Sequence, residues 1–538
     1  MTTRAAAALR ASGRRAPLLL AVPALAATGA VLLPLAYLVV RAGTASRSAW
    51  EVLEPDRTGP LVLDTALLVV AVVAAAVAIG VPLAWLVTRS DLPGRPFWAV
   101  AAALPLVIPS YVAALALLGA LGPRGLLQRV LEGPFGVERL PEIYGFPGAM
   151  AALTLSTYPY VYLLTAAALR GLDPSLEEAA RGLGRSRWSA FVHVTLPRLR
   201  PSIAAGSLLV ALYALSDFGA VSLMQYPALT RSIYLQYQAL FDREPAAVLA
   251  LVLVALTAIV LALESAARRR SPSHRVSPGS ARRAQPVGLG RWRWPALGFC
   301  TAVVGLFLAL PVAVLVYWTL EAASLATSLD LAWRAALNSL LASSAAALVA
   351  VVAALPIAFL AERYTRPWTR GLERASYVSN ALPGIVVALS LVFFGARYGG
   401  WLYQTLPILV FAYVVRFLPQ ALASLGAALR GVSPRMEEAA RGLGRGPAGV
   451  LVSVTVPLVR PGLLAGAALV FLSAMKELPA TLLLRPIGFD TLATEIWAAT
   501  SLGAYSQAAP PALLLIVVSA PIVYLLAARR GSDLGGPG

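Results

Sequence analysis

Apolar and polar positions follow one another along this chain in long blocks. Runs of Leu, Ala and Val reach or exceed the length of about 20 residues that an α-helix needs to cross a bilayer, and short Arg-containing segments separate them. Because the runs lack the period-two alternation of barrel strands, we expect helices. Twelve spans are predicted, at residues 17–40, 62–88, 97–121, 147–169, 203–224, 246–266, 296–318, 336–361, 375–396, 403–428, 462–484 and 508–528.

Composition supports the membrane class. The 538 residues are 59% hydrophobic and 13% charged, whereas soluble domains carry about 25% charged residues. One cysteine, Cys300, excludes an internal disulfide, and two histidines, His193 and His274, leave little for a His/Cys metal site. We expect Cys300 to act as a small apolar side chain and His193 to make a local hydrogen bond. No firm metal site is predicted.

The basic residues indicate topology. The formal charge is +19, but the arginines lie in short loops between apolar runs, which is typical of membrane orientation and not of nucleic-acid binding. Assigning alternate loops to the cytoplasm places 31 of the 44 Lys and Arg there, with both termini on that side. The apolar run from Ala16 to Val40 is longer than the core of a signal peptide, so we expect a retained anchor.

The second half of the chain repeats the first. Three pairs of segments are similar: "GVPLAWLVTR" from Gly80 and "ALPIAFLAER" from Ala354, "AALPLVIPSYVAAL" from Ala102 and "NALPGIVVALSLVF" from Asn380, "SDFGAVSLM" from Ser216 and "KELPATLLL" from Lys476. Six spans separate equivalent points, and because six is even the repeats are parallel. At this point a channel or a parallel-repeat secondary transporter also fits.

The repeat predicts two cores and a tether. The tether, rich in Arg, Pro, Ser and Gly, is expected to be a cytoplasmic linker. The predicted divisions are an N-terminal segment with the first span and outer loop (1–61), a first core (62–266), the linker (267–295), the seventh span and outer loop (296–335), a second core (336–528) and a cytoplasmic tail (529–538).

One polar loop sequence occurs twice in the chain, within residues 173–201 and 433–461. It reads "LEEAARGLGRSRWSAFVHVTLPRLRP" from Leu176 and "MEEAARGLGRGPAGVLVSVTVPLVRP" from Met436. Asp173 and Ser433 are predicted to cap a short helix that begins at the following proline, with glutamates in its first turn and glycines ending it after about two turns. We expect an exposed helix with alanines on its surface that enters a groove on another protein. A lipid-binding amphipathic segment is the alternative, and the common spacing of the two copies disfavours it.

These residues carry a family resemblance. The order Glu-Ala-Ala, three residues, Gly, nine residues, then aliphatic-x-aliphatic-Pro resembles the "EAA" loop of type-I ABC importer permeases, which docks on the ATP-binding subunit. The resemblance implies an all-α fold of about 12 transmembrane helices in two parallel-repeat (MetI-like) halves, in the bacterial inner membrane. It assigns ATPase coupling to eight residues: Glu178, Ala179, Ala180, Gly184, Glu438, Ala439, Ala440 and Gly444.

The resemblance also implies partners. The sequence contains no "GxxxxGK[ST]" phosphate loop, so ATP and Mg would bind two copies of a separate ATP-binding subunit. We expect no catalytic residue and no cofactor in this chain, an extracytoplasmic solute-binding protein as the other partner, and no nucleic acid. The segments from Ser216 and from Met475 look like those of ferric-iron permeases, while fused thiamine permeases remain the alternative substrate class and a secondary transporter the alternative mechanism.

Two acids at membrane depth are candidates for the translocation path. Asp217 and Glu477 occupy equivalent positions, beside Ser216 and Lys476, and a carboxylate in a membrane is costly. Ferric iron prefers oxygen ligands, which these acids and Tyr226, Tyr234 and Tyr237 offer. The competing interpretation is structural: Glu477 pairs with Lys476 or Arg416, Asp217 lies at the aqueous end of its span, and the tyrosines belong to the interfacial belt.

Overall fold

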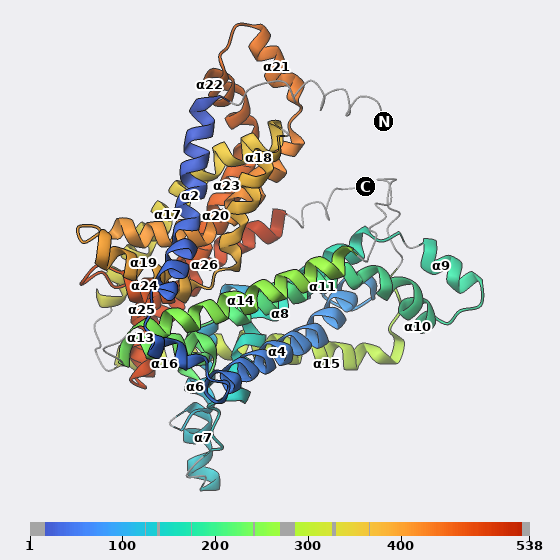
Figure 1. Cartoon of the computed structure of the whole chain (residues 1–538). Coiled ribbons are helices and arrows are strands. Elements are labelled where there is room, and N and C mark those ends of the chain that lie inside the picture. The colour runs from blue at the N-terminus through green and yellow to red at the C-terminus, as the bar shows by residue number, and fades with distance from the viewer. Residues whose placement is uncertain are drawn as a thin grey trace. The chain divides into compact units, whose positions relative to one another are not determined.

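The computed structural model describes residues 17–123, 125–136, 140–173, 175–239, 243–269, 286–324, 330–364 and 366–529. Within these ranges the regular structure is helical, apart from one isolated bridge between Ser90 and Val287 (Figure 1). Eleven of the described helices are long and apolar enough to cross a membrane, and a bent pair, taken as one span, makes twelve. The predicted all-α membrane fold is confirmed. The chain forms two compact units.

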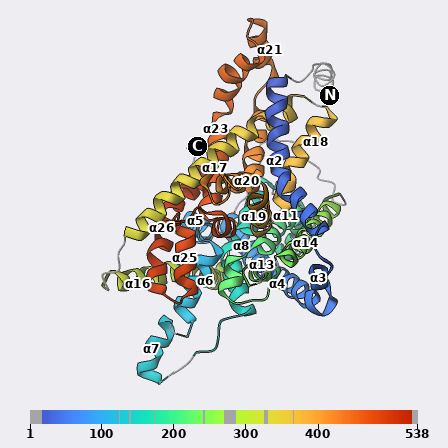
Figure 2. The ribbon, with the colours of Figure 1, turned by 60° about the vertical axis from the view of Figure 1, so that its left-hand side comes forward.

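Unit 1 contains residues 1–51, 236–254 and 329–495. Its centre is a group of three helices, α17 (Asp330–Arg363), α20 (Leu406–Gly431) and α23 (Val456–Met475), which pack against one another. Helix α2 (Leu18–Gly43) lies against α17 and α19 (Gly384–Tyr398) (Figure 2). The other elements are α3 (Arg47–Trp50), α18 (Pro367–Ser376), η6 (Tyr377–Ala381), α21 (Pro434–Gly442), α22 (Pro447–Val450), η7 (Leu451–Thr455) and α24 (Pro479–Leu484).

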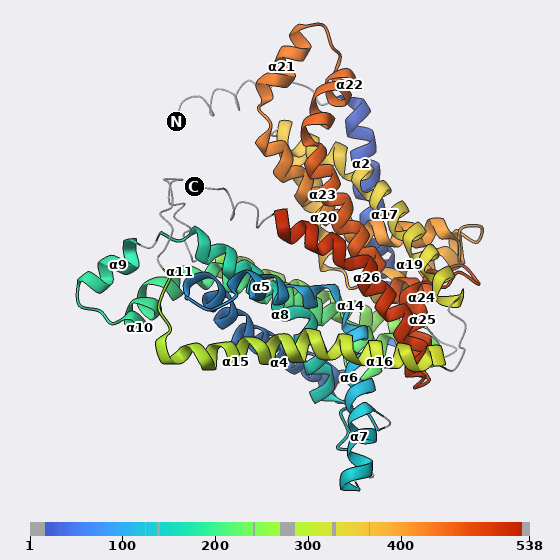
Figure 3. The same cartoon turned by 180° about the vertical axis from the view of Figure 1, so that it is seen from behind.

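Unit 2 contains residues 52–235, 255–328 and 496–538. Its centre is the equivalent group, α4 (Pro55–Arg89), α8 (Phe146–Gly171) and α11 (Leu196–Ser216). Helix α16 (Leu310–Ser324) packs against α26 (Tyr505–Arg529) and α6 (Ser110–Leu121) (Figure 3). The other elements are α5 (Arg95–Ala101), η2 (Leu104–Val107), α7 (Leu126–Phe135), α9 (Ser175–Gly182), α10 (Arg187–Ala190), η3 (Phe191–Thr195), α12 (Gly219–Leu223), η4 (Gly290–Trp292), α15 (Arg293–Val304) and η5 (Gly305–Ala309).

Four further elements have residues in both units: η1 (Glu51–Leu53), α13 (Leu229–Ala239), α14 (Glu244–Arg269) and α25 (Leu492–Ser501). The units therefore do not follow chain order. Helix α2 precedes the first core in sequence but packs with helices of the second, and α15 and α16 precede the second core but pack with helices of the first. Unit 1 thus contains α2, and unit 2 contains α15, α16 and α26, although chain order alone would give these segments to the other unit.

Glycines let the central helices of unit 2 approach closely. A Cβ on Gly80 would lie 2.9 Å from the Tyr162 backbone nitrogen, and one on Gly206 would lie 2.8 Å from the Val161 Cα. Because lipid gives helices little hydrophobic reason to associate, close packing at small residues stabilises such groups. A larger side chain at either position would push α8 away from its neighbours.

Two spans predicted as continuous are broken, at 97–121 and 375–396. Ile108 and Leu382 have extended backbone, with ψ of 113° in each, and a proline follows each of them. A proline ring disfavours helical backbone in the residue before it, so the helix stops there and restarts. In the second core the two pieces, Pro367–Ala381 and Gly384–Tyr398, differ in direction by 101°.

The predicted spans 203–224 and 462–484 are also interrupted. Helix α11 ends at Ser216 and α12 begins at Gly219, while α23 ends at Met475 and α24 begins at Pro479. Asp217 and Glu477 occupy these two breaks. Each break therefore holds one of the two acids that the sequence singled out.

Candidate functional site

The first polar loop folds as predicted into a short helix, α9, followed by a tight turn. The Asp173 carboxylate accepts a hydrogen bond from the Ser175 amide at 2.9 Å, which holds the pKa of this carboxyl below its usual value. Pro174 lies outside the described residues. At the other end, the Leu183 amide donates to the Ala179 carbonyl at 3.0 Å and Gly184 has a φ of +85°. That left-handed backbone favours glycine.

The second loop repeats this geometry in α21. The Leu443 amide donates to the Ala439 carbonyl at 3.1 Å, and Gly444 has a φ of +83°. One detail of the prediction is wrong: Ser433 occupies the N-cap position, but its hydroxyl makes no capping hydrogen bond. The Met436 amide bonds to the Ser433 carbonyl at 3.2 Å instead, in a continuation of the helical pattern.

One side of each short helix faces solvent. Glu178 and Glu438 are exposed, as are Ala179 and Ala439. Ala180 is only half-buried, and Ala440 is buried, so the prediction of surface alanines is wrong for Ala440, whose turn of α21 packs against η7 and α22.

Each loop also exposes a leucine that the sequence analysis did not single out. Leu183 is 86% exposed and Leu443 is 84% exposed. The signal was present, because "RGLGR" places an apolar residue in a polar loop twice. A single exposed leucine is common on protein surfaces, but these two recur at equivalent positions of the repeated loop.

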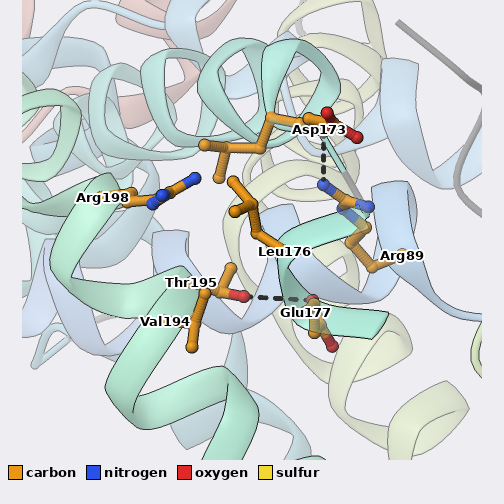
Figure 4. Close-up of a pocket in the computed structure, with 8 residues that line it drawn as sticks. Arg89, Asp173, Leu176, Glu177, Val194, Thr195 and Arg198 are labelled. Atoms are coloured by element: carbon orange, nitrogen blue, oxygen red, sulfur yellow. Dashed lines mark hydrogen bonds between the residues drawn. The ribbon is translucent and has the colours of Figure 1, made fainter. Parts of the chain in front are cut away.

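The other glutamate of each pair turns inward. Glu177 accepts a hydrogen bond from the Thr195 hydroxyl at 3.0 Å (Figure 4). Glu437 is only 2% exposed. Its carboxylate accepts hydrogen bonds from the Thr455 hydroxyl at 3.3 Å and from Arg363 Nε at 2.9 Å. Adjacent glutamates in each copy thus have different environments, one in solvent and one inside the loop.

Arg363 and Arg89 end the long helices α17 and α4, and sequence reasoning missed both as site residues. Arg363 donates to the Val432 carbonyl at 3.1 Å. Arg89 donates to the carbonyls of Leu169 at 2.9 Å and Leu172 at 3.1 Å. These carbonyls belong to the ends of α20 and α8, where backbone acceptors lack helical partners. The signal was again present, because both arginines end the similar strings from Gly80 and Ala354.

A π-helical turn follows the short helix at the same place in each loop. Elements η3 (Phe191–Thr195) and η7 (Leu451–Thr455) contain the threonines that bond to the inward glutamates. Such turns are rare and often mark functional positions. His193 lies in η3, and its Nδ1 is 2.9 Å from the Ser189 carbonyl oxygen, so the predicted local hydrogen bond is confirmed.

Asp217 lies in the break between α11 and α12 and is 7% exposed. Its carboxylate accepts hydrogen bonds from the Ala220 amide at 2.9 Å and from the Ser110 hydroxyl. The Thr230 hydroxyl donates to the main-chain carbonyl of Asp217 at 2.6 Å. The side chain therefore caps the start of α12. Ser216, before it, is half-buried and donates to the Tyr213 carbonyl at 3.1 Å.

Glu477 lies in the equivalent break and is 4% exposed. Its carboxylate accepts from the Ala480 amide at 3.2 Å, the same i to i+3 cap, and from Arg416 at 2.5 Å. Arg416 is one of the two partners that the sequence offered. Lys476, the other, is half-buried at the end of α23. Placement in the translocation path stays a prediction for all four residues.

The tyrosines named from the sequence have separate environments. The Tyr226 hydroxyl donates to the Asp64 carbonyl at 2.8 Å. The Tyr234 ring lies 4.8 Å from that of Phe218 and 6.3 Å from that of Trp497, measured between centroids. The Arg243 guanidinium lies over the Tyr237 ring, with its Cζ atom 4.7 Å from the ring centroid. Cys300 is fully buried, in agreement with the expected small apolar role.

Comparison with known proteins identifies a family and several relatives. The family model described as "Binding-protein-dependent transport system inner membrane component" matches residues 76–271 and 354–529. The Fe(3+)-transport system permease protein FbpB 2 of Haemophilus influenzae is 36% identical over 385 residues, which cover 71% of this chain and 76% of the relative. The ferric transport system permease protein FbpB of Actinobacillus pleuropneumoniae is 25% identical over 437 residues, 78% of this chain and 64% of that protein.

A third relative is similar over a shorter length. The molybdenum transport system permease protein ModB of Escherichia coli is 36% identical over 132 residues, 24% of this chain and 56% of its own length. The two matches to the family model both include a polar loop and the buried acid that follows it. The duplication read from the sequence is therefore a duplication of this family's domain.

Proposed function

Because the chain belongs to the family of inner membrane components of binding-protein-dependent transport systems, we propose that it is the translocation subunit of an ATP-driven ferric-iron importer. It is a multi-pass membrane transport protein and not itself an enzyme. Iron is favoured because the two relatives named for ferric transport match this chain over most of its length. The match to the molybdenum relative covers only 24% of the chain. Thiamine remains the second candidate substrate.

The observation that carries the proposal is the pair of exposed loop helices α9 and α21. Each presents a glutamate and a leucine to solvent at equivalent positions, Glu178 with Leu183 and Glu438 with Leu443. A leucine fills an apolar pocket on a partner, and a carboxylate accepts charge-assisted hydrogen bonds around it. Two such helices fit two copies of an ATP-binding subunit, which would hold the ATP and Mg.

The cycle follows from this docking. ATP-driven closure of the two partner subunits would move α9 and α21 and, through them, the helices of the two cores, so that the path opens to opposite sides of the membrane in turn. The loops and both termini would face the cytoplasm, in keeping with the distribution of basic residues. A solute-binding protein would deliver ferric iron on the other side.

Reconstitution tests the proposal. The chain, its ATP-binding subunit and its binding protein are placed in liposomes, and uptake of radioactive ferric iron is measured with and without ATP, with thiamine as competitor. We expect uptake that requires ATP and both partners and that thiamine leaves unchanged. Uptake by the chain alone, driven by an ion gradient, would contradict the mechanism, and ATP-driven uptake of thiamine instead of iron would contradict the substrate.

A further inference from the structure

The inward glutamates have no part in the docking described above. Glu177 and Glu437 lie beside the exposed glutamates in sequence, yet both turn toward the base of the loop. At the base of the loop lies the arginine that ends a long membrane helix: Arg363 of α17 pairs with Glu437, and Arg89 of α4 lines the same pocket as Glu177. We call Arg89 with Glu177, and Arg363 with Glu437, the Arg–Glu latches of unit 2 and unit 1.

The latch of unit 1 is closed. Arg363 Nε donates to Glu437 Oε1 at 2.9 Å, and the same guanidinium donates to the Val432 carbonyl at 3.1 Å. Thr455 of η7 adds a hydrogen bond to the same carboxylate oxygen at 3.3 Å. The ends of α17 and α20, the helix α21 and the turn η7 are thereby joined through three side chains, those of Arg363, Glu437 and Thr455.

The latch of unit 2 has the same parts but lacks the central bond. Arg89 donates to the Leu172 carbonyl at 3.1 Å and Thr195 donates to Glu177 at 3.0 Å, as in the other copy. In the described part of the chain, however, Arg89 and Glu177 form no ion pair, and Arg89 Nε is buried without a hydrogen-bond partner. Both side chains line the same small pocket (Figure 4).

The two copies thus contain the same arrangement of residues, with the Arg–Glu bond formed in unit 1 and not formed in unit 2. A buried guanidinium N–H without an acceptor is unfavourable, and the acceptor that satisfies it in unit 1 has an equivalent, Glu177, across the pocket in unit 2. A small movement of α9 toward α4 would make the missing bond. The guanidinium is held by its bonds to the Leu169 and Leu172 carbonyls, so the movable part is the helix.

We propose that the Arg–Glu latches fasten the loop helices to α4 and α17, and that the unit 2 latch closes when an ATP-binding subunit engages α9. This inference rests on the proposed function. Arg89, Arg363, Glu177 and Glu437 are then positioning residues for coupling: they pass the movement of a docked helix into the membrane. With the unit 2 latch open, the partner binds α9 and hydrolyses ATP, but the movement of α9 does not reach helix α4.

A purely structural role makes a different prediction for Glu177. Glu177→Gln keeps an acceptor for the Thr195 hydroxyl, and in this structure there is no Arg89–Glu177 bond for it to lose. If the latch only stabilised the fold as seen here, this substitution would change nothing. If the latch closes during transport, the substitution removes the charged acceptor that closure needs.

The experiment uses the reconstituted complex with its ATP-binding subunits and binding protein. Co-purification of the ATP-binding subunit, ATP hydrolysis and substrate taken up per ATP are measured for Glu177→Gln, with Glu51→Gln, an exposed acid of η1, as matched control. We expect normal co-purification and thermal stability, continued hydrolysis, and uptake per ATP lowered about tenfold, the effect of losing one charge-assisted hydrogen bond. The control should match wild type.

Two further results decide between the possibilities. Uptake per ATP equal to wild type in Glu177→Gln would overturn the latch, and release of the ATP-binding subunit would show that Glu177 docks instead. Arg89→Lys keeps a positive charge and is expected to retain part of the coupling, whereas Arg89→Gln is expected to lose it; equal coupling in the two would also overturn the latch. Absence of ATP-driven uptake in the wild-type complex would contradict the proposed function itself.

Discussion

Arg416 Nη1 forms an ion pair with Glu477 Oε2 at 2.5 Å, and the guanidinium occupies space that is free because residue 384 is a glycine. A Cβ at position 384 would overlap Arg416. In the first core Ser110 follows the proline of the broken span, as Gly384 does in the second core, and it donates its hydroxyl to Asp217. The same break in two membrane spans therefore holds its acid in two ways, by an ion pair in one and by a hydroxyl in the other.

Substituting Gly384 tests this arrangement. Gly384→Ala should shift the Arg416 guanidinium and weaken its ion pair with the buried Glu477. The loss of stability should be at most the roughly 3–5 kcal/mol that breaking a buried pair costs. The thermal unfolding temperature of the purified protein measures the effect. Gly371→Ala is the control, because Gly371 lies in α18 with nothing within 4 Å of the added carbon. Equal unfolding temperatures for the two variants would contradict the role of Gly384.

The two acids themselves are tested by amide substitutions. If the acids take part in translocation, Asp217→Asn and Glu477→Gln should slow uptake while the complex assembles and basal ATP hydrolysis continues. The structure adds a difference between them: Glu477→Gln also deprives the half-buried Arg416 of its counter-charge and should lower thermal stability more. Normal uptake in both variants would leave the acids a structural role only.

The leucines of the loops should anchor the ATP-binding subunits. Replacing Leu183 and Leu443 together by Ser removes two apolar anchors that are 86% and 84% exposed. Because fully burying a leucine side chain is worth about 1.5–3 kcal/mol, the affinity should fall about tenfold or more per site. Binding of the purified ATP-binding subunit to the chain in nanodiscs measures this. Leu502→Ser, a change at another well-exposed leucine in unit 2, should leave the affinity unchanged.

Much of this fold could be predicted from hydrophobic runs, because membrane helices need length and apolar character more than specific partners. The repeated loop predicted the short helices α9 and α21 and their glycine turns correctly, since caps and positive-φ glycines are local features. The breaks at Ile108 and Leu382 were also readable from the prolines that follow. They were missed because proline is common within membrane helices.

The rest depended on tertiary contacts. The environments of Glu177 and Glu437 could not be distinguished from those of their neighbours by sequence, because helix rotation decides which glutamate faces solvent. The packing of α2 with the second core joins segments far apart in the chain, and no local pattern encodes that. Arg89 and Arg363 end two aligned strings, but only the fold places Arg363 in an ion pair with Glu437 and Arg89 in the pocket that Glu177 lines.

If α9 and α21 dock the ATP-binding subunits through Glu178 and Glu438, reversing both charges should release these subunits. The double variant Glu178→Arg with Glu438→Arg reverses the charge at two exposed positions, so the membrane part should stay folded and inserted. We predict that affinity purification of this variant no longer recovers the ATP-binding subunit and that ATP-driven uptake is lost. Recovery of the subunit at the wild-type level would contradict the claim.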